Sequence, residues 1–69
     1  MTRYSSLRMR LKIYLRRECY IWLCCREETN VSFGWIIGYR KDNSVVFKDD
    51  ESRSAKAIPL QEIESCGAV

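Results

Sequence analysis

Residues 31–50, VSFGWIIGYRKDNSVVFKDD, are interpreted as two β-strands joined by a polar turn. In the first strand, residues 31–39, Gly34 and Gly38 interrupt an apolar sequence. The second strand, residues 44–48, contains a β-branched and aromatic run, Val-Val-Phe at 45–47. A glycine in a strand has no side chain to pack, so a sheet can coil tightly there. The stretch therefore predicts a small, strongly curved barrel.

The composition is that of one small globular domain. The chain has 69 residues, of which 46% are hydrophobic and 30% charged, and this composition is not that of a disordered segment. A core of this size supplies only about 3–5 kcal/mol of net stability, so such chains often use disulfides, metals or subunit association. We expect a single domain over residues 1–69, with a polar lead-in at 1–7 and a tail at 67–69.

The charge is distributed unevenly along the chain. Residues 1–17 contain six basic side chains and no acidic one, so a net charge of +3 leaves residues 18–69 at −3. A basic segment of this kind suits contact with phosphate, with anionic lipid or with an acidic patch on a neighbouring subunit. A solvated surface without a ligand is the alternative.

The cysteines do not predict a metal site. The chain contains Cys19, Cys24, Cys25 and Cys66 and no histidine, and these spacings do not form the CxxC-like pairs of structural zinc sites. We interpret the cysteines as buried free thiols. The first ten residues do not resemble a signal peptide, and the longest apolar run, residues 20–25, is too short to span a bilayer. We therefore expect a cytoplasmic protein with no cofactor and no membrane association.

Residues 8–16 support two predictions. A strand would have one apolar face, formed by Met9, Leu11, Ile13 and Leu15. A helix would have an apolar stripe, formed by Leu7, Leu11, Tyr14 and Leu15. In the helix Met9 and Ile13 would lie among the arginines on the opposite side. The alternation holds at all nine positions, so we favour the strand, although Leu, Met, Arg and Lys are all good helix formers.

The remaining elements follow from apolar runs and turn residues. We expect a turn at 16–19, a strand at 20–26 that is apolar on both sides, and a strand at 55–58 that stops at Pro59. Residues 60–65 suit a short helical or 3₁₀ turn that leads into a last strand. Together these elements predict a mainly β fold, a small SH3-like barrel of about five strands with one short helical or 3₁₀ turn.

The middle of the chain contains a recognisable order of hydrophobic strands, a glycine and an acid-containing turn. A hydrophobic strand at 21–23 is followed by Phe-Gly-Trp-Ile at 33–36, an acid-containing turn with Asp42 and the hydrophobic strand at 45–47. Over residues 15–65 this arrangement resembles the Sm-like family, which includes the bacterial Hfq RNA chaperones. Leu-Arg-Arg-Glu, ahead of the first of these strands, is similar to the basic rim sequence of Hfq. The resemblance implies an Sm-like barrel that assembles through its edge strands and binds RNA.

Several positions depart from the family's pattern. Arg40 stands where the family has an acid, and the loop at 26–30 lacks the usual glycine. The Tyr-Lys-His signature with which Hfq proteins read uridine-rich RNA is absent, since the chain has no histidine. The N-terminal element is predicted as a strand, whereas the family has a helix there.

The basic N-terminal segment makes binding of RNA or single-stranded nucleic acid our first functional hypothesis. Arginine holds phosphate and aromatic faces stack unpaired bases, and Tyr4, Tyr14 and Tyr20 are interleaved with the arginines. The candidate contact residues are Arg8, Arg10, Arg16, Arg17, Arg40 and Lys41.

A protein-interaction module without nucleic-acid binding is the second hypothesis. Residues 9–15 and 20–25 have more apolar surface than one small monomer readily buries, so we expect a homo-oligomer formed through exposed strands, or a protein partner. Of the large aromatic residues, we expect Trp35 and Phe47 to pack in the core.

An enzymatic function is not predicted. The acidic residues lie in polar connections or near the C-terminal end, where solvated surface is their ordinary role, and they include Glu27, Glu28, Asp49, Asp50, Glu62 and Glu64. Cys24 or Cys25 would need a neighbouring base to act as a nucleophile, and the chain has no histidine to supply one.

Overall fold

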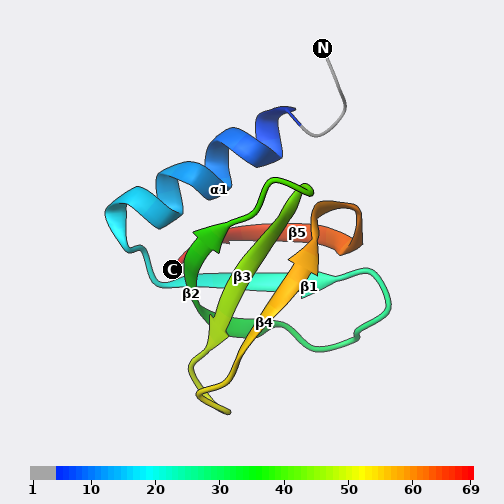
Figure 1. The fold of residues 1–69 in the computed structure, drawn as a ribbon. Helices are drawn as coiled ribbons and strands as arrows, with labels where there is room; N and C mark the ends of the chain where they lie inside the picture. The colour runs from blue at the N-terminus through cyan, green and yellow to red at the C-terminus, as the bar shows by residue number, and fades with distance from the viewer. Residues whose placement is uncertain (1–4) are drawn as a thin grey trace.

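The computed structural model describes residues 5–69 as one five-stranded antiparallel sheet with a helix packed against it (Figure 1). The elements in chain order are α1 (Ser5–Arg17), β1 (Ile21–Cys25), β2 (Ser32–Tyr39), β3 (Ser44–Asp49), β4 (Ala55–Pro59), the 3₁₀ helix η1 (Leu60–Glu62) and β5 (Ile63–Ala68). The strand order is β4-β3-β2-β1-β5. The mainly β prediction with about five strands and a 3₁₀ turn is confirmed.

The sheet bends so that its two ends contribute to one core. In Figure 1 the β3–β4 end crosses over the β1–β5 end. Val45 and Phe47 of β3 belong to the same buried cluster as Ile21 of β1 and Ile63 of β5. Phe47 is fully buried, as predicted. Strands β4 and β5 are the two edges, and closure into a barrel remains a prediction.

Helix α1 corrects the prediction for the N-terminal segment. The strand favoured at 8–16 is wrong, because Leu11 and Tyr14 are buried while Met9 and Ile13 are 67% and 42% exposed. This is the helical stripe, and its residues are good helix formers. The alternation of apolar residues was misleading because a helix can leave a methionine and an isoleucine in solvent.

The predicted bounds of the N-terminal lead-in, of the turn at 16–19 and of the C-terminal tail also need correction. The lead-in at 1–7 is wrong for residues 5–7, which belong to α1, and the call for residues 1–4 lies outside the described residues. The turn expected at 16–19 begins only at Glu18, whose φ of 52° ends the helix in the left-handed region. Residues 67 and 68 are not a tail, since Gly67 and Ala68 pair with β1.

The β2–β3 hairpin is confirmed, but its two glycines differ in role. At Gly34 a Cβ atom would overlap the carbonyl oxygen of Lys48 on β3. At Gly38 a Cβ atom would only touch the Val46 side chain at an ordinary 3.5 Å. A β-bulge between Ile36 and Gly38 adds the other distortion of this strand. The curvature therefore depends on Gly34 and on the bulge, and not on Gly38.

The connection between β4 and β5 is the predicted 3₁₀ turn. The N–H of Leu60 in η1 donates to the carbonyl oxygen of Asn43 in the β2–β3 turn at 3.0 Å. The N–H of Arg26, just after β1, donates to the carbonyl oxygen of Glu62 at 2.9 Å. These two bonds tie η1 to both halves of the sheet. None of the helices in residues 5–69 has the length and apolar character needed to cross a bilayer.

Candidate nucleic-acid interface

The first half of α1 meets the β2–β3 hairpin at Tyr39. Nε of Arg8 donates a hydrogen bond to the hydroxyl oxygen of Tyr39 at 3.0 Å. Nζ of Lys12, one helical turn further on, lies 5.2 Å from the centroid of the same ring. Arg40 and Lys41 directly follow Tyr39 in the sequence, so two further cations lie in the turn that begins after this tyrosine.

Arg10 lies on another side of α1. Its Nη1 atom donates to the carbonyl oxygen of Cys66 on β5 at 3.3 Å, which links the helix to the far edge of the sheet. Burial raises the pKa of the Cys66 thiol, and the neighbouring Arg10 partly opposes that rise. Arg10 is therefore separated from the group around Tyr39.

Arg16 and Arg17 occupy the last turn of α1 and are both exposed. Cations at this end of a helix are favourable because they face the negative end of the helix dipole. The helix contains no acidic residue, so every charged group on its solvent side is basic, although the apolar Met9 and Ile13 are exposed there as well. The six predicted contact residues are therefore not one cluster: Arg8 and Arg10 bond to different strands, Arg16 and Arg17 share the last turn of α1, and Arg40 and Lys41 lie in the β2–β3 turn.

Three aromatic residues, the exposed Tyr20 and Phe33 and the half-buried Trp35, form a second feature, the aromatic platform. The rings of Tyr20 and Phe33 are stacked with centroids 6.2 Å apart, and those of Tyr20 and Trp35 are tilted with centroids 5.1 Å apart. Tyr20 is 37% exposed and Phe33 is 42% exposed. Trp35 is only partly buried, so the prediction that it packs in the core is wrong.

The β3–β4 loop supports one edge of the aromatic platform. The hydroxyl of Tyr20 donates to Oδ2 of Asp50 at 3.0 Å, and the N–H of Asp50 donates to the carbonyl oxygen of Phe33 at 2.8 Å. Desolvation, followed by the hydrogen bond to Asp50, raises the pKa of Tyr20. The neighbouring Asp49 accepts the N–H groups of Glu51 and Ser52 within the loop. Both aspartates therefore hold the loop in place.

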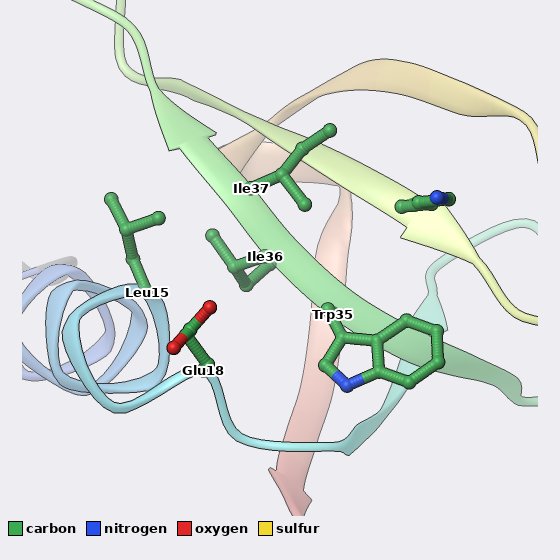
Figure 2. Close-up of a pocket in the computed structure, with 6 residues that line it drawn as sticks. Leu15, Glu18, Trp35, Ile36 and Ile37 are labelled. Carbon is green, nitrogen blue, oxygen red and sulfur yellow. The ribbon is translucent and has the colours of Figure 1, made fainter.

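A cleft of about 480 Å³ lies between the end of α1 and β2 (Figure 2). Leu15 and Glu18 lie on its helix side, and the indole of Trp35 lies at the end away from Leu15. The rest of the lining comes from Ile36, Ile37 and Lys48. A smaller cleft of about 210 Å³ shares Trp35 and Lys48 and adds Asp49, Asp50 and Arg53. The cross-strand pair Trp35 and Lys48 therefore separates two hollows on the surface.

The three tyrosines predicted to stack bases have different positions. Tyr14 is buried in the core and is unavailable to a ligand, so that call is wrong. Tyr20 is exposed and belongs to the aromatic platform, whereas Tyr4 lies outside the described residues. Sequence reasoning missed Phe33, although its position two residues before Trp35 in a strand placed both on one face.

The thiols and carboxylates do not gather into a further site. Over residues 5–69, no group of three or more histidine, cysteine, aspartate and glutamate side chains is placed to hold a metal ion. Burial is the main cause that raises the pKa of Cys25, with smaller contributions from nearby glutamates, and a raised pKa lowers the reactive thiolate fraction.

Comparison with known proteins gives no match, whether to a family model, a curated protein or a solved structure. A helix that carries cations without acids attracts an anionic polymer, and exposed aromatic faces accept flat rings.

Proposed function

We propose that this protein is a non-catalytic nucleic-acid-binding module whose contact surface is the solvent side of α1 together with the β2–β3 turn. The observation that carries the proposal is the charge of α1, which has basic residues and no acid and whose Arg8 is bonded to Tyr39, the residue just before the turn that contains Arg40 and Lys41. Phosphate contacts of this kind supply most of the affinity of a non-specific complex.

The remaining cations of the helix extend this surface. At 1.5 Å per residue, the 13 residues of α1 give a basic edge about 20 Å long. Lys12, Arg16 and Arg17 are exposed along it. An RNA strand can therefore follow the helix from the β2–β3 turn to Arg17.

Membership of the Sm-like family is part of this proposal. The helix at Ser5–Arg17 supports it, because the family has a helix ahead of its first strand. The exposed Arg16 and Arg17 are the residues that are similar to the basic rim of Hfq. The missing Tyr-Lys-His signature argues that any base preference differs from that of Hfq.

The test is the salt dependence of binding to a labelled single-stranded RNA. We expect affinity to fall steeply between about 50 mM and about 200 mM salt, and Arg16→Ala to reduce the slope of log K against log salt by about one phosphate contact. Lys56→Ala is the matched control, since it removes one exposed cation from β4, away from α1. Absence of binding at low salt, or equal effects of the two substitutions, would overturn the proposal.

Self-association is the second candidate function, and the sheet edges favour it. Ala55, Lys56 and Ala57 on β4, and Glu64 and Ser65 on β5, are exposed at the two edges of the sheet. An unpaired strand edge is a template for another strand. We expect light scattering to show a homo-oligomer whose size does not change when Arg16 is replaced. A monomer at high protein concentration would exclude this candidate.

A further inference from the structure

We infer that the aromatic platform stacks unpaired bases, so that the ligand of this protein is single-stranded. This inference rests on the proposed function and names the part of the ligand that the cations of α1 do not contact. It concerns Tyr20, Phe33 and Trp35, of which the sequence hypothesis included only the first as a base contact.

The rings of Tyr20 and Phe33 are exposed, and that of Trp35 is half-buried. The inward-facing residues of the same region, Ile21, Gly34 and Ile36, already fill the core. Phe33 and Ile37, which is 50% exposed, are left on the outer side beside Trp35 and Tyr20. A group of apolar residues on the surface of so small a protein usually marks a contact site.

Trp35 lies between two clefts on the surface. Its indole lines both clefts, so a flat ligand can approach the aromatic platform from either hollow. Lys48 lies directly across from Trp35 and lines both clefts, while Arg53 lines the smaller one. A stacking surface with cations beside it is the arrangement that binds single-stranded nucleic acid.

The larger cleft extends to the end of the basic helix α1. The wall of the larger cleft opposite Trp35 is formed by Leu15 and Glu18, which flank Arg16 and Arg17 in the sequence. A strand whose phosphates follow α1 can therefore turn a base into this cleft. Each cleft has both signs of charge in its lining, Glu18 and Lys48 in the larger one and Lys48, Arg53 and two aspartates in the smaller one, so the continuity with α1, and not local charge, favours the helix side for the backbone.

A duplex does not meet these conditions. Its bases are already stacked and paired, so the rings of the aromatic platform have no free base face to contact. A protein partner could contact the same apolar rings, but the rings would then show no preference for an RNA over an abasic oligonucleotide. The experiment below compares these two ligands.

The experiment uses Trp35 as its own reporter. Trp22→Phe leaves Trp35 as the sole tryptophan, and its fluorescence is titrated with a single-stranded RNA, an abasic oligonucleotide of equal length and a duplex. We expect saturable quenching by the single-stranded RNA alone. In the wild-type background, Phe33→Leu should weaken binding of that RNA about tenfold or more and leave the abasic oligonucleotide unaffected, as expected for the loss of one stacked base.

The outcomes separate this inference from the proposed function. If the RNA binds with a steep salt dependence, but the abasic oligonucleotide binds as tightly and Phe33→Leu has no effect, the stacking inference fails and the proposed function stands. If no oligonucleotide binds at low salt, the proposed function fails and the inference fails with it. In that case, oligomers that dissociate on Phe33→Leu would assign the aromatic platform to protein contact.

Discussion

The hydroxyl of Tyr39 on β2 accepts a hydrogen bond from Nε of Arg8 on α1, across 31 positions of sequence and 3.0 Å of space. Lys12 lies over the same ring, so one tyrosine fixes two cations of the helix. This contact sets where the basic side of α1 lies relative to the β2–β3 turn. It therefore connects the packing of the helix to the surface proposed to bind RNA.

Tyr39→Phe should lower both stability and RNA affinity. The substitution removes the acceptor for Arg8 and keeps the ring, so we expect a loss of about 0.5–1.5 kcal/mol in the free energy of unfolding. Urea denaturation measures this change. Tyr20→Phe is the control, because it removes a hydrogen bond between two exposed groups, the Tyr20 hydroxyl and the Asp50 carboxylate, and its effect should be smaller. Equal losses in the two variants would contradict the anchoring role of Tyr39.

Gly34→Ala should prevent folding, whereas Gly38→Ala should be tolerated. The added methyl group at Gly34 overlaps the Lys48 carbonyl, and overpacking usually costs about 1–3 kcal/mol or more, which approaches the whole stability of a chain this small. At Gly38 the methyl group has room and the φ angle is not positive. Circular dichroism and denaturation of the purified variants measure the difference. Two equally stable variants would show that β2 and β3 do not approach closely at Gly34.

Lysine substitutions in α1 distinguish the helix from the strand that the sequence favoured. In a strand, Met9, Leu11 and Ile13 would share one face and respond alike. In the helix only Leu11 is buried, so Leu11→Lys should unfold the protein. Met9→Lys and Ile13→Lys should change the free energy of unfolding by no more than about 0.5 kcal/mol. Thermal denaturation of the three variants measures these effects, and a large loss with Met9→Lys would contradict the helix.

Stability should decline in alkaline solution because the pKa of Tyr14 is raised above its ordinary value of 10.0, mainly by burial. The unfolded chain then releases the phenolic proton at a lower pH than the folded chain. The contribution of this group is therefore fully present below pH 10.0 and is lost as the pH rises above it. Tyr14→Phe removes the titrating group, so its denaturation midpoint should fall less between pH 9 and pH 11 (roughly one unit either side of the ordinary tyrosine pKa). An identical decline in both proteins would show that Tyr14 does not contribute.

Local patterns were sufficient to predict most of the sheet. Gly34 within an apolar alternation gave the bend of β2, and Pro59 followed by Leu60 and Ile63 gave the 3₁₀ turn. Residues 8–16 were predicted wrongly because the alternation of apolar residues fits all nine positions better than the helical period does, and only packing against β2 shows which apolar residues are buried. Helix propensity was the signal that favoured the correct answer.

The candidate site was only partly predictable, for a different reason. Arg16 and Arg17 could be proposed as phosphate contacts from the basic composition of the segment, and both side chains are exposed. The separation of Arg10 from Arg8 depends on contacts with Cys66 and Tyr39, and no local pattern encodes such distant partners. The exposure of Phe33 depends on which side of β2 faces the core, and the packing of Ile36 in the core, which no local pattern encodes, decides that side.

The bulge at Ile37 lets the two halves of β2 face opposite sides of the sheet. Before it, Trp35 pairs with the exposed Lys48 and faces outward, and after it, Tyr39 pairs with the buried Val45 and faces the helix. One inserted residue thus reverses the sidedness of β2 halfway along its length. A single strand can thereby present rings to a ligand with its first half and hold α1 with its second, and deleting Ile37 would force it to give up one of these two tasks.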